Sequence, residues 1–313
     1  MIFAGIFLKA IEKKVIISYN RPINCMGGAM KYSEILADKF TDVLRCSVCG
    51  ERLEASENKK SLLCFGVKRH CFDISAKGYV NMALGQSGGG DGKDAVRSRT
   101  AFLSKGFYAP FANEICTLLS KYVATGGFLV DAGCGEGYYT SQASNMCGLR
   151  AIGIDLSKSA IESAAKSASA RGLDNVAYAV AGIFSMPLVD ECADAVMNLF
   201  APCAEEEFTR VLKKGGILLV AGAGRDHLYG FKSAIYDTPY KNELREDLPM
   251  SMEKLESVKV KFDITLESYE DKINLFAMTP YYYRTSRDDA EKLRADTPIV
   301  TEVEFDIDIY RKR

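Results

Sequence analysis

Short apolar runs and amphipathic segments alternate along the second half of the chain. Each apolar run is bounded by glycine, proline or polar residues, which is typical of a buried strand; these runs lie at 128–130, 151–155, 176–180, 194–200 and 217–221. Ser157 is placed to cap a helix whose apolar face comprises Ala160, Ile161, Ala164, Ala165 and Ala168. Strands alternating with helices predict an α/β fold, a doubly wound sheet with ligands at its carboxyl edge.

Further elements follow from the same patterns. Residues 93–120 are predicted to be mostly helical, with Arg97 and Arg99 exposed near the start. Glu205 to Lys213 is predicted to be a helix that stops at Gly215-Gly216. Residues 258–266 and 302–310 alternate with period two, which predicts an antiparallel pair closing the sheet. Val15 to Ile17 could form a short strand.

The first apolar run leads directly into a glycine-rich loop, Asp131-Ala-Gly133-Cys-Gly135-Glu-Gly137. Glycines without a Cβ let the backbone approach a ligand closely, and the helix that follows adds amide donors. The spacing is G-x-G-x-G and differs from the dinucleotide pattern G-x-G-x-x-G, which argues against a nicotinamide cofactor. Asp155 ends the next strand about twenty residues later, where a carboxylate can accept hydrogen bonds from both ribose hydroxyls.

This loop resembles the first motif of the class I S-adenosylmethionine (SAM) methyltransferases. The resemblance implies a Rossmann-like methyltransferase sheet with an antiparallel last strand, and SAM as the cofactor. Its implied cofactor-binding residues in this stretch are Asp131, Gly133, Gly135, Glu136, Gly137, Tyr138 and Asp155.

Composition limits the other possibilities. The 313 residues suffice for one large domain and a small one, and no apolar run approaches a membrane span, so we expect a soluble protein with no membrane partner. A net charge of −1 gives no overall field that attracts nucleic acid, so any RNA contact must come from local patches. Ten cysteines without a signal peptide predict reduced cytoplasmic thiols, some of them metal-bound.

A metal site is predicted near the N-terminus from Cys46-x₂-Cys49 and Cys64-x₅-His70. Two such pairs can complete a tetrahedral Zn²⁺ site, which would hold together a small zinc-ribbon-like segment without a core of its own. Cys71 is an alternative fourth ligand, and we favour His70; ordinary buried thiols remain the other interpretation. Nearby basic residues could face phosphates or simply solvent, and these are Lys59, Lys60, Lys68 and Arg69.

The phrase Phe72-Asp73…Gly78-Tyr79-Val80-Asn81 lies between this zinc signature and the glycine loop. With both, it resembles the 23S rRNA (guanine-N1)-methyltransferase family, from about residue 44 to the C-terminus. The resemblance implies methylation of a guanine N1 in a hairpin loop of that rRNA, by homodimers whose zinc modules flank an RNA cleft. It also implies that Tyr108 and His227 lie at the SAM site, while Arg99 belongs to an Arg-x-x-Phe-Leu phrase.

We therefore divide the chain into four parts: an N-terminal extension that could be disordered (1–40), a zinc-binding RNA-recognition module (41–84), a glycine-rich hinge with entry helices (85–125) and the SAM-dependent methyltransferase domain (126–313).

Three other functions stay open. A small-molecule SAM methyltransferase could use the zinc module as a lid, an rRNA cytosine-C5 methyltransferase could use Cys203 as its nucleophile, and a non-catalytic RNA-binding protein could retain the fold. The sequence assigns no proton acceptor, although Asp190, Asp226 and His227 are candidates. Phe200 and the run 281–283 could stack on a target base.

Overall fold

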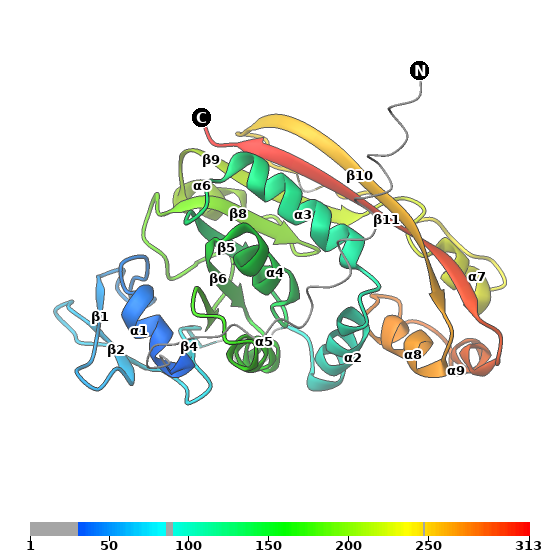
Figure 1. The fold of residues 1–313 in the computed structure, drawn as a ribbon, viewed down its shortest axis with the longest axis horizontal. Helices are drawn as coiled ribbons and strands as arrows, with labels where there is room; N and C mark the ends of the chain where they lie inside the picture. The colour runs from blue at the N-terminus through cyan, green and yellow to red at the C-terminus, as the bar shows by residue number, and fades with distance from the viewer. Residues whose placement is uncertain (1–30, 86–89, 247) are drawn as a thin grey trace, which may run out of the picture. The chain divides into compact units, whose positions relative to one another are not determined.

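One eight-stranded sheet organises the part of the chain that the computed structural model describes, residues 31–85, 90–246 and 248–313 (Figure 1). Its order is β10-β11-β9-β8-β5-β6-β7-β4. Strands β4 to β9 are parallel, whereas β11 runs antiparallel to β9 and β10 antiparallel to β11. The strand bounds are β4 Tyr79–Asn81, β5 Phe128–Ala132, β6 Arg150–Asp155, β7 Val176–Val180, β8 Ala193–Leu199, β9 Leu212–Ala223, β10 Glu253–Leu266 and β11 Ile299–Arg311.

Helices cover both faces of this sheet because the strand residues alternate between two apolar clusters. Leu129 of β5 faces one cluster and Val130 faces the other, and both are fully buried. The first cluster is covered by α3 (Ala109–Tyr122), α4 (Tyr138–Cys147), α5 (Lys158–Ala170), α7 (Tyr229–Ile235) and α8 (Tyr269–Ala277). The second is covered by α1 (Ile35–Lys39) and α6 (Glu205–Val211). The twelve-residue α2 (Lys93–Ser104) contributes Phe102 and Leu103 to the first cluster, and the remaining short helices are η1 Tyr32–Glu34, α9 Arg287–Glu291 and η2 Lys292–Arg294.

The predicted α/β architecture is confirmed, including the antiparallel closing strands. The Ser157 hydroxyl accepts a hydrogen bond from the Ala160 N–H and caps α5, and all five residues of the predicted apolar face are buried. The end of one predicted helix was wrong: α6 ends at Val211 instead of Lys213. The chain enters β9 at Leu212, and Gly215-Gly216 lies inside that twelve-residue strand instead of ending the helix. The predicted strand at Val15–Ile17 lies outside the described residues.

A small antiparallel sheet precedes the large one and carries the cysteine pairs. It consists of β1 (Leu53–Ala55), β2 (Ser61–Cys64) and β3 (Cys71–Asp73), in that order. The chain then continues into β4, which pairs with β7 at the edge of the large sheet. The Arg45 N–H donates to the Pro187 carbonyl at 3.0 Å and the Val189 N–H donates to the Val43 carbonyl at 2.9 Å, so main-chain bonds join the segment before β1 to the loop between β7 and β8. No helix in the described ranges is both long enough and apolar enough to cross a membrane.

Candidate cofactor and metal sites

The sheet reverses its strand order at β5, which has β6 on one side and β8 on the other. Ligands of open α/β sheets bind beyond the carboxyl ends of strands at such a point. Asp131 lies near the end of β5, is 2% exposed, and accepts a hydrogen bond from the Thr140 hydroxyl at 2.5 Å. Burial raises the pKa of Asp131 to about 7, although the Thr140 hydrogen bond opposes this shift. A cationic ligand group would therefore find a desolvated acid at this edge.

The glycine loop that follows needs glycine for both conformation and space. Gly133, Gly135 and Gly137 all have positive φ, and Gly137 is the N-cap of α4 with φ 74°. A Cβ on Gly137 would lie 2.5 Å from the Tyr178 hydroxyl oxygen, so a larger residue cannot be accommodated there without movement. Tyr138, half-buried, then begins α4. The loop therefore presents backbone instead of side chains to a ligand.

Asp155 connects this loop to the next helix. Its two carboxylate oxygens accept hydrogen bonds from the Gly135 N–H at 3.0 Å and the Ser157 N–H at 2.7 Å. Burial raises the pKa of Asp155, while these two backbone bonds lower it. The carboxylate thus lies at the end of β6, beside the glycine loop, where the ribose-binding acid was predicted.

Arg99 is a site residue whose surroundings the sequence did not predict. It is not exposed as expected: its side chain is 22% exposed and forms ion pairs with Asp91 and, at 3.3 Å, with Glu136. Burial raises the pKa of Glu136, and the Arg99 charge partly offsets that effect. A signal was present, because Phe102 and Leu103 follow Arg99 by three and four positions and share its helix face. Both are buried, which directs Arg99 inward.

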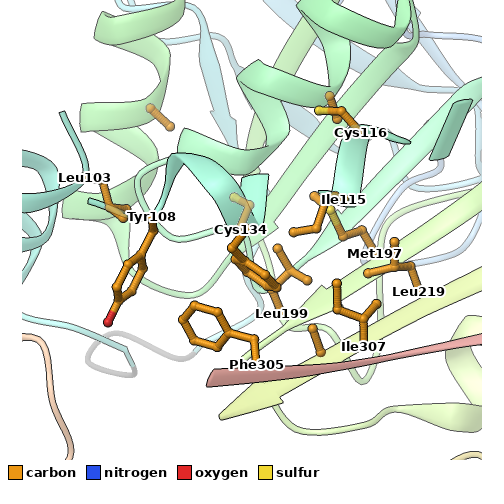
Figure 2. Close-up of a cluster of buried hydrophobic side chains, with 14 of the residues drawn as sticks. Leu103, Tyr108, Ile115, Cys116, Cys134, Met197, Leu199, Leu219, Phe305 and Ile307 are labelled. Atoms are coloured by element: carbon orange, nitrogen blue, oxygen red, sulfur yellow. The ribbon is translucent and has the colours of Figure 1, made fainter. Parts of the chain in front are cut away.

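Tyr108 and His227, which the resemblance implies to be SAM-site residues, lie together. Their Oη and Nε2 atoms are 3.4 Å apart. The Tyr108 ring packs edge-on against Phe305 of β11 at 5.1 Å between ring centroids (Figure 2). Burial lowers the pKa of His227 to about 3, so its imidazole is neutral at pH 7. The Glu304 N–H donates to Nδ1 at 3.3 Å, which assigns the proton to Nε2. His227 in this arrangement has no lone pair left to accept a substrate proton.

An aromatic side chain marks the end of β8. Phe200 has φ 56°, an unusual conformation for a bulky residue, and its N–H donates to the Ala221 carbonyl at 3.0 Å. Its ring is 48% exposed and contacts Phe111 and Phe305 at centroid distances of 5.6 and 5.2 Å. The backbone therefore holds a partly exposed aromatic face at the same sheet edge as the glycine loop.

The other candidate proton acceptors are held by cations. Asp190 pairs with Arg210 at 2.6 Å and with Arg45 at 3.2 Å, and Asp226 pairs with Lys241 at 2.8 Å. The hydrogen bonds from Arg210 and Lys241 lower the pKa values of these two carboxyls, which makes them weaker bases. Cys203 is half-buried after β8.

The two cysteine pairs converge on one point in the small sheet. The ligand atoms of Cys46, Cys49, Cys64 and His70 all lie within 4.8 Å of one another, and Cys71 is outside this group. The His70 Nδ1 is 3.5 Å from each of the sulfurs of Cys46 and Cys49. Zinc bonds of about 2.0–2.3 Å give tetrahedral edges of about 3.6–3.8 Å, close to these separations. Three thiols and an imidazole are the donors that zinc prefers, so this cluster could bind zinc.

Comparison with known proteins defines the class first. A family model described as a methyltransferase domain matches residues 126–278. Together with the sheet order and the glycine loop, this makes the protein a class I SAM-dependent methyltransferase.

Three relatives then narrow the assignment. A "Putative 23S rRNA (guanine-N(1)-)-methyltransferase" from Bacillus subtilis is 29% identical, with 86% of this chain and 97% of the relative covered. The 23S rRNA (guanine(748)-N(1))-methyltransferase of Streptomyces fradiae is 27% identical over 84% and 94% of the two chains. A relative from Micromonospora griseorubida with the same name as the Bacillus protein is 31% identical over 59% and 67%. The chain belongs to the 23S rRNA (guanine-N1)-methyltransferase family.

Proposed function

We propose that the protein transfers a methyl group from SAM to N1 of a guanine in a hairpin loop of 23S rRNA. The observation that carries this proposal is its membership of a family whose members bear that name, in a chain that retains both cofactor acids. Asp131 and Asp155 lie on either side of the glycine loop, which suits the ammonium and ribose groups of the cofactor. The intact acids also argue against a non-catalytic binding protein.

The residues at the sheet edge divide the work of this reaction between them. When bound, SAM supplies a methyl group on a sulfonium. The glycine loop, Asp131, Asp155, Tyr108 and His227 would hold the donor and align its methyl group with N1 of the guanine. Methyl transfer would form the N1–C bond as the S–C bond breaks, and it would release the N1 proton. Asp190 and Asp226 are ion-paired and His227 carries its proton on Nε2, so we assign the proton to none of these three.

Phe200 is our candidate for holding the target base. A guanine reached by a methyltransferase must leave its stack, and an aromatic face compensates part of that cost. Phe200 offers such a face at the end of β8, with its backbone held by Ala221 and its ring supported by Phe111 and Phe305.

The zinc cluster segment is proposed as the RNA-recognition module. Lys60, Lys68 and Arg69 are exposed on it, whereas Lys59 pairs with Asp38 at 2.7 Å. Exposed cations near a small folded sheet can contact phosphates without a net basic charge on the whole chain. We further propose that the protein acts as a homodimer in the cytoplasm, with the two modules flanking the hairpin.

Primer extension on 23S rRNA from cells with and without the gene tests the proposed function. An N1-methyl group blocks the Watson–Crick edge, so reverse transcription should stop at one guanine in a hairpin loop only when the gene is present. Incubation of the purified protein with SAM and unmodified rRNA transcript should create the same stop. A modified cytosine without a stop would instead favour C5 methylation through Cys203, and transfer only to metabolites would favour the small-molecule enzyme.

Replacing Phe200 tests its role. Base stacking on an aromatic residue contributes about 1–3 kcal/mol, so Phe200→Ala should lower kcat/KM for rRNA about 5- to 150-fold with SAM affinity unchanged. Tyr283→Ala is the matched control, because Tyr283 is 80% exposed and belongs to the other candidate aromatic run. If Tyr283→Ala lowers kcat/KM and Phe200→Ala does not, the stacking role belongs to that run.

A further inference from the structure

We propose that Arg99 binds the carboxylate at the amino-acid end of SAM, in the place that the Asp91 carboxylate takes in this structure. This inference rests on SAM being the cofactor and is independent of which RNA base is methylated.

The charge balance of the site points to this role. Asp131, Glu136 and Asp155 all lie at the glycine loop, and burial raises the pKa of each. Such acids suit the ammonium, the sulfonium and the ribose hydroxyls of SAM, but they repel its carboxylate. The cation that pairs with this group of acids among the described residues is Arg99, through Glu136. A cofactor with a carboxylate needs that cation at the same place.

The position of the guanidinium supports a direct contact. Phe102 and Leu103 anchor the same face of α2 in the apolar core, which directs Arg99 toward the glycine loop. Its Nη1 atom lies 3.3 Å from Glu136 Oε2 and 3.2 Å from the point where a Cβ on Gly135 would stand. The planar guanidinium has paired N–H donors that match the two oxygens of a carboxylate. Arg99 thus contacts the loop over which the cofactor binds.

Asp91 shows how a carboxylate binds to Arg99. Its side chain pairs with Arg99 Nη2 and is 46% exposed, whereas the Glu136 side chain is 6% exposed. The Asp91 carbonyl accepts hydrogen bonds from the hydroxyls of Ser157 at 2.7 Å and Ser159 at 3.2 Å. The backbone is therefore fixed at the start of α5, while the carboxylate can rotate into solvent. Asp91 can leave Arg99 to a ligand without any change in the fold.

Binding measurements with two ligands test the proposal. SAM and decarboxylated SAM differ by the carboxylate, so wild-type protein should bind SAM more tightly. Charge-assisted hydrogen bonds contribute about 1.5–3 kcal/mol, so Arg99→Gln should weaken SAM binding about 10- to 100-fold. It should leave decarboxylated SAM within about twofold, because that ligand lacks the group that Arg99 binds. Asp91→Asn, which removes the competing carboxylate, should tighten SAM binding several-fold and leave the decarboxylated ligand unchanged.

Arg97→Gln is the matched control, because Arg97 lies on the same helix with its side chain 82% exposed. It should leave both affinities unchanged. Equal weakening of both ligands by Arg99→Gln would give Arg99 a structural role only, and a retained preference for SAM would also overturn the proposal. Weaker SAM binding by Asp91→Asn would overturn the displacement of Asp91. None of these results depends on rRNA methylation, so a failure here is distinct from a failure of the proposed function.

Discussion

Burial raises the pKa of Asp131 and lowers the pKa of His227, and both residues lie at the same edge of the sheet. It keeps a proton on the carboxyl up to about pH 7, and it keeps the imidazole neutral down to about pH 3. Below about pH 7 both side chains are therefore mostly neutral before a ligand arrives. The desolvated carboxyl of Asp131 is therefore uncharged until a cationic ligand binds. The charge of that ligand then favours the ionised carboxylate.

The Asp131 environment predicts how stability depends on pH. The unfolded carboxyl loses its proton near pH 4, while the native one keeps it to about pH 7, so the native state binds the extra proton in between. The free energy of unfolding should therefore fall as pH rises from 4 to 7, by up to about 1.4 kcal/mol per pH unit from this group. Asp131→Asn should remove this contribution and flatten the slope. Urea unfolding of both proteins at pH 5, 6 and 7 without cofactor measures this pH dependence. If the unfolding free energy changes with pH equally in the wild type and in Asp131→Asn, the assignment is contradicted.

At this scale the sequence predicted where the acids lie but not what surrounds them. Asp131 and Asp155 follow strands, so strand periodicity alone places them at the sheet edge. Arg99 was misjudged because an arginine near a helix start is usually solvated. Its helix face could have been found from Phe102 and Leu103, but its partners Asp91 and Glu136 lie eight and thirty-seven positions away. Ion pairs at such separations are set by the fold and leave no local pattern.

Among the elements, the glycine loop joins β5 to α4 through a conformation that has no room for a side chain. Gly137→Ala should destabilise the protein by about 2–4 kcal/mol, because it adds overlap with Tyr178 and Ala164 to the cost of a positive φ. Gly172→Ala is the control, since Gly172 has φ 66° with nothing within 4 Å of the added Cβ. It should cost only about 1 kcal/mol. If chemical denaturation shows equal losses of unfolding free energy in the two variants, steric overlap with Tyr178 and Ala164 does not add to the cost of Gly137→Ala.

The small sheet around the cysteine pairs should depend on its metal. We expect one zinc per chain by metal analysis, and Cys64→Ser or a strong chelator should remove it and lower the melting temperature, because ligand and folding energies are linked. Cys71→Ser should keep the metal, since Cys71 is exposed and lies outside the four-residue cluster. Loss of zinc from Cys71→Ser with retention in His70→Asn would reverse the choice of fourth ligand.

Element boundaries were less predictable than elements. The apolar face of α5 and its Ser157 cap follow from local sequence, and all were found where predicted. The α6–β9 junction was not, because two consecutive glycines normally end a helix. Here they lie in a strand, where a Cβ on Gly216 would stand 3.2 Å from the carbonyl oxygens of Ala193 and Asp194 in the neighbouring β8. That close approach depends on strand pairing, which local propensity cannot report.

For the whole molecule we expect a homodimer. Light scattering coupled to size exclusion should give twice the chain mass of 34.4 kDa. The expected mass should persist after Phe200→Ala, which alters the base pocket alone. A monomer at micromolar concentration would contradict the two-module arrangement around one hairpin, while leaving the methyl-transfer chemistry untouched.

The pairing of β4 with β7 has a thermodynamic consequence for this architecture. The strand β4, which follows the cysteine cluster, is the outermost parallel strand of the large sheet. Unfolding of the small sheet should therefore weaken the main-chain hydrogen bonds between β4 and β7. Metal binding and the stability of the transferase sheet should therefore be thermodynamically coupled, so that each increases the other. Under the proposed function, zinc depletion should therefore weaken both the RNA-recognition module and the edge of the transferase sheet.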